Sequence, residues 1–302
     1  MTDTDVTGQP VFIVGMQRSG TTMLRFMLNA HPRIAIPFES DFIPKFYKKL
    51  GEYGDLGCAT NMQRLLSDIS AQPFVKRGNL VRSCSAVLER NPRSYSGLIA
   101  SMYGVYAEHE GKQRWGDKDP DYISEIDVLW KLFPDCRIIH IVRDGRGVAN
   151  SLRKLTWGSK NILRIAHRWS WQSTLGHKMG VVIGPKHFME VRYEDLVAAP
   201  ESCLRRICEF VEEPFDEQML HYYERAADAL PNASLQYHTN SVRPPDISKV
   251  TAWQHEMAIS DQILFEEEAG DTLKLFGYEC TARRNSWGGK IRGLKYTFMN
   301  RW

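Results

Sequence analysis

The chain has 302 residues, of which 43% are hydrophobic and 25% are charged, a balance typical of a globular protein with a sizeable core. Its net charge of +3 is too small to indicate nucleic acid as a partner, and no apolar run approaches the ~20 residues of a membrane span. The polar, acidic start argues against a secretory signal, and the six scattered cysteines form no C-x-x-C pair. We therefore expect a cytoplasmic protein with reduced thiols and without a zinc site.

A strand, a tight turn and a helix are predicted in direct succession in the stretch 10–28. Residues 11–14 form a short apolar run of the kind found in strands that are buried on both faces. Gly15 interrupts that run, and apolar residues then recur at helical spacing, so we expect a helix that begins near Gly20 or Thr21. Such a turn directs its amides and the first N–H groups of the helix toward one point, where the helix dipole favours an anion.

Gly15 and Gly20 have the spacing of the phosphate-binding loop G-x-x-x-x-G-K-[ST]. The lysine of that pattern is replaced by Thr21, which is followed by Thr22, and the nearest cation is Arg18 inside the loop. We therefore expect a phosphate-like group that is held by a guanidinium, by hydroxyls and by amides. The alternative is an ordinary strand-to-helix turn whose glycines only satisfy the geometry of the backbone.

A second strand, turn and helix with the same order are predicted later in the chain. Residues 137–142 form another buried strand pattern, and Asp144 with Gly145 makes a turn before the next helix. Arg143 thus stands at the end of a strand, which is where open α/β sheets bind their ligands. The alternative role for Arg143 is a surface ion pair with Asp144 or Glu125.

Strands and helices alternate along the chain, which predicts an α/β fold with a parallel sheet covered by helices on both faces. Besides the elements above, we expect strands at 34–36 and 188–191, helices at 121–133, 162–179, 201–212, 215–230 and 260–275, and a loop at 233–250. Residues 45–114 lack strand signals and indicate a helical excursion beside the sheet, a natural place for acceptor specificity. We expect Trp169 and Trp171 to lie in the core. One domain is predicted over 1–282, followed by a basic tail at 283–302.

The strings QRSGTTML and IVRDGRGVANS, in that order, resemble the motifs of the sulfotransferases that use 3′-phosphoadenylyl sulfate (PAPS) as donor. The resemblance extends to about Cys280 and implies a P-loop-type fold, with 3′,5′-adenosine bisphosphate (PAP) as the product of the donor. In that family the first motif holds the 5′-phosphosulfate and the second holds the 3′-phosphate. It assigns the 5′ end to Arg18, Ser19, Gly20, Thr21 and Thr22, and the 3′-phosphate to Arg143 and Ser151. A donor with phosphates at both ends of its ribose needs two such anion sites.

The stretch HPRIAIPFESDFIP is similar to the one that follows the first helix in tyrosylprotein sulfotransferases, whose catalytic base matches Glu39. A base is needed because the acceptor hydroxyl loses its proton as it attacks sulfur. The alternative for Glu39 is a helix-capping or salt-bridging role, and His31 is a weaker candidate base because His31-Pro32 is explained as a helix stop.

The stretch WGDKDP matches the lysine-containing segment of the family and places Lys118 beside the leaving phosphate. There Lys118, together with Arg18, would stabilise the charge that develops on the bridging oxygen. The alternative is a loop lysine that pairs with Asp117 or Asp119. We expect no metal, because the sequence shows no carboxylate or histidine cluster at ligand spacing.

Softer matches to the family are Tyr193, as a donor contact, and Ser248 with Lys249 in a segment that closes over the donor. Two departures matter: we expect no counterpart of the membrane anchor and the disulfide of the Golgi relatives, and Asp41 replaces an arginine two residues after the base. These departures weigh against acidic peptides and favour a cytoplasmic enzyme with another acceptor.

Residues 283–302 hold six basic residues and no acidic one, with apolar side chains along one helical face. Packing onto the domain is the first interpretation of this tail, and peripheral contact with a membrane surface is the alternative. The oligomeric state is open, and a homodimer is one option.

The function predicted from the sequence is transfer of a sulfuryl group from PAPS to an acceptor hydroxyl of a small molecule, carbohydrate, lipid or peptide tyrosine. The alternatives are a P-loop kinase-like phosphotransferase, whose loop would normally carry the lysine that Thr21 replaces, and a non-catalytic nucleotide-binding protein.

Overall fold

The computed structural model describes residues 9–226 and 241–280, which fall into two compact units. The first unit combines the residues up to Arg143 with Trp171–Val250, and the second combines Asp144–Ser170 with the residues from Thr251 onward. The single domain expected over 1–282 remains a prediction, and the tail at 283–302 lies outside the described residues.

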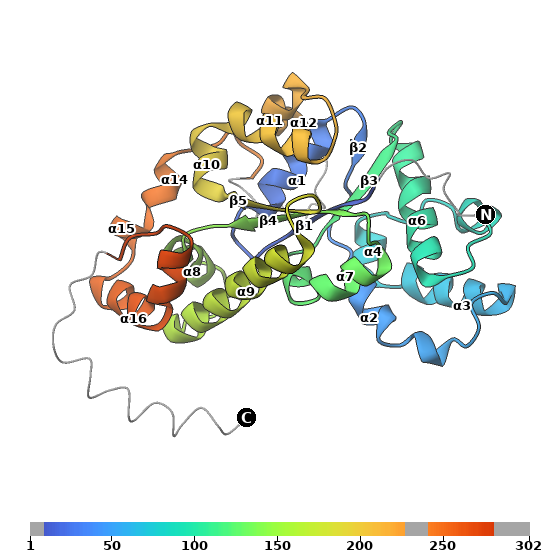
Figure 1. Cartoon of the computed structure of the whole chain (residues 1–302), viewed down its shortest axis with the longest axis horizontal. Helices are drawn as coiled ribbons and strands as arrows, with labels where there is room; N and C mark the ends of the chain where they lie inside the picture. The colour runs from blue at the N-terminus through green and yellow to red at the C-terminus, as the bar shows by residue number, and fades with distance from the viewer. Residues whose placement is uncertain (1–8, 227–240, 281–302) are drawn as a thin grey trace. The chain divides into compact units, whose positions relative to one another are not determined.

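A five-stranded parallel sheet forms the centre of the first unit, with helices on both of its faces (Figure 1). The strand order is β2-β3-β1-β4-β5, which confirms the predicted fold class. The strands are β1 (Val11–Val14), β2 (Ile34–Ala35), β3 (Arg114–Lys118), β4 (Arg137–Val142) and β5 (Phe188–Arg192).

Strand β3 is the sheet element that the sequence pattern does not predict. Its sequence RWGDK is polar, yet all five residues are buried. Their charges are tolerated because they have partners: Arg114 donates to the Gln9 carbonyl at 2.7 Å and pairs with Glu213 at 3.5 Å. Strand signals based on apolar runs miss such a strand.

The helices of the first unit include those predicted near the start of the chain and around residues 201–212, together with α10, which was not predicted. They are α1 (Thr21–Ala30), α2 (Ile43–Tyr47), α3 (Ala59–Ser70), α4 (Pro73–Arg77), α5 (Cys84–Glu89), α6 (Tyr95–His109), α7 (Ile126–Leu132), α10 (Tyr193–Ala198), α11 (Pro200–Phe210) and α12 (Tyr223–Ala226). Short 3-10 helices lie at η1 (Leu50–Glu52), η2 (Pro120–Ser124) and η3 (Glu217–His221). Two helices reach across the boundary between the units, α9 (Ile162–Ile183) and α14 (Ser248–Thr251).

The single helix expected at 121–133 is wrong, since the chain forms η2 and then α7 with a break at Glu125. Asp119 caps η2 by accepting a hydrogen bond from the Asp121 amide at 3.0 Å. Tyr122 is buried and bonded to the residues around Ser40, so tertiary contacts override the helical pattern here. The helix expected at 215–230 is likewise divided into η3 and α12, and its end lies outside the described residues.

Side chains alternate between two hydrophobic clusters, one on each face of the sheet. Phe12 and Ile138 belong to the cluster that contains α2, α3, α6 and α7, whereas Ile13 and Ile139 belong to the cluster with α1, α10 and α11. In the first cluster Trp115 stacks on Tyr103 with 4.7 Å between ring centroids. The sheet is therefore buried on both faces, as a parallel sheet requires.

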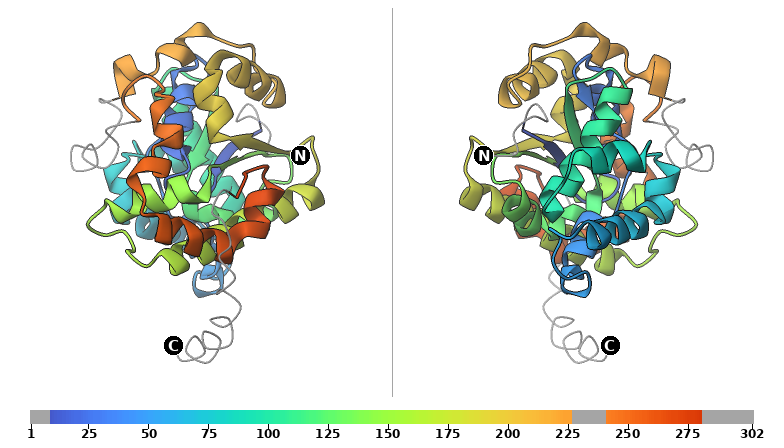
Figure 2. Two further views of the ribbon diagram at one scale, coloured as in Figure 1. Left: turned by 90° about the vertical axis from the view of Figure 1, so that its left-hand side faces the viewer. Right: turned by 90° about the vertical axis from the view of Figure 1, so that its right-hand side faces the viewer.

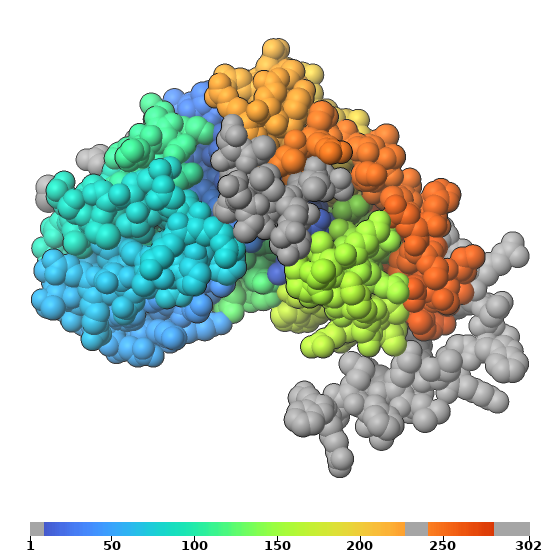
Figure 3. All heavy atoms as spheres, turned by 180° about the vertical axis from the view of Figure 1, so that it is seen from behind, coloured from blue at the N-terminus to red at the C-terminus, as the bar shows by residue number. Residues whose placement is uncertain are grey.

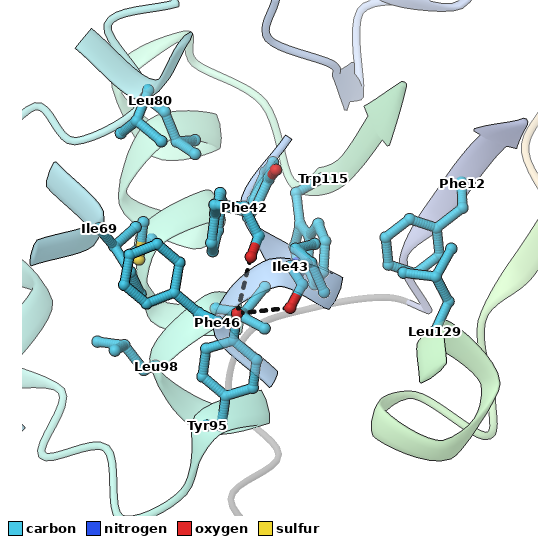
Figure 4. Packing of buried hydrophobic residues seen from close by; sticks show 14 of the residues in the cluster. Phe12, Phe42, Ile43, Phe46, Ile69, Leu80, Tyr95, Leu98, Trp115 and Leu129 are labelled. Carbon is cyan, nitrogen blue, oxygen red and sulfur yellow. Dashed lines mark hydrogen bonds between the residues drawn. The ribbon is translucent and has the colours of Figure 1, made fainter. Parts of the chain in front are cut away.

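Helices α2 to α6 occupy the region predicted as a helical excursion, and β3 begins directly after it. Their side chains gather as one mass of blue to cyan spheres in Figure 3, and the helices lie together in the right-hand view of Figure 2. Helix α2 is fixed to α6 because the Tyr95 hydroxyl donates to the Ile43 carbonyl at 2.8 Å (Figure 4). The segment just after Glu39 is thus anchored in the core of the excursion.

The second unit contains α8 (Gly145–Arg153), the first part of α9, α15 (Trp253–Glu256) and α16 (Ile259–Leu275). Its centre is Arg146, which bonds to Asp144 at 2.8 Å, pairs with Glu266 and lies 3.9 Å from the centroid of the Trp253 ring. Trp169 is fully buried against Phe265, as predicted.

Trp171, which belongs to the first unit, is 53% exposed, so its predicted core position is wrong. The two tryptophans are two residues apart on α9, a spacing that turns them to different faces of a helix. Within the described ranges, no helix combines the length and the apolar character needed to cross a membrane.

Truncation of Phe12 tests the core of the first unit. Phe12 is fully buried and contacts Trp115 edge to face at 5.9 Å. We expect Phe12→Ala to lower the free energy of unfolding by about 3–5 kcal/mol, because a cavity replaces the ring. Val181 is 73% exposed, and Val181→Ala should change it by less than about 0.5 kcal/mol. Denaturant unfolding measures both, and equal effects would contradict the packing described here.

Candidate active site

The loop between β1 and α1 has the backbone geometry of an anion site. Gly15, Arg18 and Gly20 have positive φ angles of 150°, 73° and 99°. A Cβ atom on Gly15 would lie 2.4 Å from the carbonyl oxygen of Ile141, so only glycine allows the loop to pass so close to β4. The loop turns tightly enough to bring its amides to the start of α1.

The start of α1 carries hydroxyls and no acidic side chain. Its N-cap is Gly20, which provides no side-chain cap, and its first turn contains no acid. Ser19, Thr21 and Thr22 are all buried at this point. No acidic side chain in the first turn of α1 therefore competes with an external anion for the first-turn amides and the positive end of the helix dipole.

Arg143 stands at the end of β4 and reaches the loop. Its guanidinium donates to the Arg18 carbonyl at 3.2 Å and to the Lys249 carbonyl at 2.9 Å, and it lies 4.4 Å from the centroid of the Tyr193 ring. The Tyr193 ring in turn packs on Gly20, where an added Cβ would lie 2.4 Å from its Cδ2 atom. The structure thus brings Arg18, Gly20, Arg143 and Tyr193 together.

Two guanidinium groups approach each other at this edge of the sheet. Burial lowers the pKa of Arg18, and the positive charge of Arg143 lowers it further. Like charges repel each other, and an anion between them relieves that repulsion. This electrostatic arrangement suits a phosphate or sulfate group.

Lys118 connects the loop to Glu39. Its ammonium group forms an ion pair with Glu39 and donates to the Thr22 hydroxyl at 3.3 Å. The Lys118 side chain is 1% exposed and that of Glu39 is 23% exposed. Because Lys118 is the register partner of Ile13 on β1, its side chain is placed beside the end of the strand that leads into the loop. Of the flanking aspartates, which the alternative interpretation pairs with Lys118, Asp117 accepts from the Lys118 main-chain amide at 2.9 Å, and while burial raises the pKa of both, the charge of Lys118 lowers it.

His31, the weaker candidate base, is a structural residue. Its Nδ1 accepts from the Arg33 amide at 3.1 Å, so Nε2 carries the proton and donates to the Pro214 carbonyl at 2.8 Å. Both ring nitrogens are therefore engaged by the backbone, and the ring is fully buried.

The sequence pattern does not indicate that the buried acids on either side of Lys118 belong to the site. Burial raises the pKa of Asp119 well above its usual value, and the carboxylates of Glu39 and Asp117 raise it further. Asp117 is hydrogen-bonded to Ser40 at 2.7 Å. The alternation of acids with Lys118 in WGDKDP is the sequence feature that marks them, and by itself it indicates only ion pairing.

Ser151, Ser248 and Lys249 are the remaining residues that the family motifs suggest. Ser151 lies on α8 in the second unit, so its role remains a prediction. Lys249 contributes its main-chain carbonyl to Arg143, while its side chain lies 3.9 Å from Asp246. Ser248 begins α14 and is exposed. Across residues 9–226 and 241–280, no group of three or more histidine, cysteine or acidic side chains could hold a metal ion.

Comparison with known proteins gives a consistent family. A family model described as the sulfotransferase family matches residues 10–217. Protein-tyrosine sulfotransferase A of Caenorhabditis elegans is 24% identical over 92% of this chain and 69% of its own length. Protein-tyrosine sulfotransferase of Drosophila melanogaster is also 24% identical over 92% of this chain, which spans 53% of that relative.

Two solved structures resemble the fold. The sulfotransferase domain of the Synechococcus PCC 7002 olefin synthase has a TM-score of 0.60 and 25% identity, covering 93% of this chain and 99% of that domain. The sulfotransferase domain from the curacin biosynthetic pathway has a TM-score of 0.62 and 21% identity, covering 91% and 99%.

Substitution of Gly20 tests the anion site. We expect Gly20→Ala to weaken binding of PAP by about tenfold or more, because the new methyl group displaces the Tyr193 ring and with it Arg143. Gly111 has a similar φ of 69° with no atom near an added Cβ. Gly111→Ala should cause the same backbone strain as Gly20→Ala, about 1 kcal/mol, but should leave the affinity for PAP unchanged. Isothermal titration calorimetry measures both, and equal affinities would place the anion elsewhere.

Proposed function

Because the chain belongs to the sulfotransferase family, which confirms the predicted family and class of enzyme, we propose that it transfers a sulfuryl group from PAPS to an acceptor hydroxyl. The observation that carries this proposal is the meeting of Lys118, Glu39 and Thr22 beside the loop that bears Arg18. A base, a fixed cation and an anion-binding loop are the three groups that the reaction needs.

The donor is proposed to bind with its 5′-phosphosulfate on residues 18–22 and its 3′-phosphate near Arg143. The paired guanidinium groups of Arg18 and Arg143 support this placement, since they present positive charge at the same sheet edge as the first turn of α1. Ser151 is proposed as a further ligand of the 3′-phosphate, and Tyr193 as a donor contact, on the basis of the family motif.

Glu39 is proposed to take the proton of the acceptor hydroxyl. The acceptor oxygen then forms a bond to sulfur, the bond between sulfur and the bridging oxygen breaks, and PAP leaves with the electron pair. The side chain of Glu39 is partly exposed, which supports access of an acceptor to it, whereas the side chain of Lys118 is buried. This arrangement suits a base that faces the acceptor and a cation that faces the leaving group.

Lys118 can serve the leaving oxygen without losing its present partners. An ammonium group has three N–H donors, and among the described residues two of them are hydrogen-bonded, to Glu39 and to Thr22. The third donor is proposed to bind the bridging oxygen of the donor. The contact with Thr22 fixes the ammonium relative to the start of α1, which is where the phosphosulfate would lie.

The charges of the site are the structural feature that bears on the identity of the acceptor. Burial raises the pKa of Asp41, and the nearby carboxylates of Asp121 and Glu39 raise it further, although Lys45 opposes them. An acidic peptide would bring additional negative charge to this group of acids. We therefore propose an acceptor other than an acidic peptide. The cytoplasmic location expected from the sequence stays a prediction.

Replacement of Glu39 tests the proposed base, after an acceptor screen with radiolabelled donor has identified a substrate. We expect Glu39→Gln to lower kcat by about 10²–10⁴-fold, because the amide cannot accept the proton, and to leave the affinity for PAP unchanged. Glu125 also pairs with a lysine, Lys48, at 2.5 Å, but on the surface. Glu125→Gln is therefore the matched control and should retain full activity. Full turnover by the Glu39→Gln variant would exclude Glu39 as the base.

Nucleotide preference and magnesium dependence separate this proposal from its alternatives. We expect calorimetry to show binding of PAP, and turnover to continue in EDTA, because arginine, lysine and backbone groups supply the positive charge. Binding of ATP without PAP, with turnover that requires magnesium, would instead support a kinase-like phosphotransferase. Binding of PAP without turnover on any acceptor in the screen would support a non-catalytic nucleotide-binding protein.

A further inference from the structure

Ser40 and Asp117 are hydrogen-bonded to each other and stand next in sequence to Glu39 and Lys118. The Ser40 hydroxyl donates to Asp117 Oδ2 at 2.7 Å, and the two residues are 1% and 0% exposed. The hydrogen bond therefore connects the segment that carries the proposed base to the strand that carries the proposed cation, one residue away from each.

The hydrogen-bond directions around Ser40 are fully determined by its single proton. Because that proton goes to Asp117, Ser40 can only accept from its other neighbours. The Tyr103 hydroxyl donates to it at 2.9 Å, and the Tyr122 hydroxyl lies at 3.1 Å. Tyr122 therefore donates to Ser40, and its oxygen also accepts from the Ile43 amide at 3.2 Å. The Ser40 hydroxyl thus has partners on three different elements, β3, α6 and η2.

Asp117 uses both of its carboxylate oxygens. While Oδ2 accepts from Ser40, Oδ1 accepts from the Lys118 amide at 2.9 Å. Burial raises the pKa of Asp117, and its hydrogen bonds oppose that effect. The carboxylate is also hydrogen-bonded to the Tyr103 hydroxyl, so it accepts on both of its oxygens. An asparagine has only one acceptor oxygen and cannot replace it in this role.

The segment that carries Glu39 needs such an anchor. The Glu39 side chain is 23% exposed, so burial alone does not fix it. Asp41, two residues further, has a φ angle of 50°, a conformation that costs a non-glycine residue about 1–3 kcal/mol. Ser40 lies between them and is the buried residue of the three.

We propose that Ser40 and Asp117 are positioning residues, whose hydrogen bond holds Glu39 at the ammonium of Lys118 in the geometry that proton removal requires. This inference rests on the proposed function, because it assigns a purpose to the placement of the proposed base. Tyr103 and Tyr122 support it by holding the Ser40 hydroxyl in the required orientation.

Substitutions of Ser40 and Asp117 give the first test. We expect Ser40→Ala and Asp117→Asn each to lower kcat by about 10- to 100-fold, the effect of a small misplacement of a reacting group. The affinity for PAP should remain that of the wild type, because none of the atoms that these substitutions change belongs to the anion site. Ser40→Thr keeps the hydroxyl and should restore most of the turnover.

Matched controls separate this effect from a general loss of a hydrogen bond. Ser70 donates to the Leu66 carbonyl at 2.6 Å within α3, and the Tyr53 hydroxyl donates to the Asp68 carboxylate at 2.8 Å. Ser70→Ala and Tyr53→Phe should leave kcat unchanged. Tyr103→Phe, the milder variant, keeps a donor to Ser40 in Tyr122 and should lower kcat less than Ser40→Ala does.

Coupling to Glu39 gives the decisive readout. If Ser40 acts through Glu39, then Ser40→Ala should have little further effect on the residual kcat of Glu39→Gln, whereas independent effects would multiply. The proposal would be overturned if the effects of Ser40→Ala and Glu39→Gln on kcat multiply, or if Ser40→Ala leaves kcat unchanged. It would also be overturned by a parallel loss of PAP affinity that Ser40→Thr does not restore. Wild-type turnover in Glu39→Gln would instead refute the proposed base, and is measured in the same series.

Discussion

The buried ammonium group of Lys118 is the constraint around which the first unit is arranged. A charge that is withdrawn from water is tolerated only when it is paired and hydrogen-bonded. Glu39 and Thr22 meet that requirement from two different directions, one from the segment after β2 and the other from the first turn of α1. The lysine, the acid and the anion-binding loop are therefore parts of a single electrostatic arrangement, in which the loss of one partner leaves another uncompensated.

A second arrangement of charge lies at the end of β4. Arg18 and Arg143 repel each other, and the ring of Tyr193 holds one of the guanidinium groups by its face. The two arrangements differ in their balance of charge: Lys118 forms an ion pair with Glu39, whereas Arg18 and Arg143 bring two like charges together, with the more distant charge of Glu39 opposing their repulsion. This difference matches the roles proposed for them, since the arginines would receive the phosphates of a ligand and Lys118 would act on charge that develops only during the reaction.

Much of this organisation could be predicted from sequence because it depends on local patterns. The apolar runs of β1 and β4, the glycine spacing of the loop and the motif around Arg143 are all visible within short windows. Strand β3 could not be predicted in this way, because RWGDK is polar and its burial depends on partners far along the chain. Neither Ser40 nor Asp117 carries a local signal, since their bond joins residues 77 positions apart. The break before α7 has the same origin, in the tertiary contacts of Tyr122.

The position of β3 between β2 and β1 also has a consequence for how the molecule folds. Glu39 and Lys118 are separated by 79 positions in the sequence, so their contact requires the intervening helices to close as one long loop. Such closure is entropically costly, and contacts at large sequence separation slow the folding of a domain. The anion site depends on contacts of even larger sequence separation, since Arg143 donates to the Arg18 carbonyl across 125 positions. Both sites are therefore completed only when β3 and β4 lie beside β1.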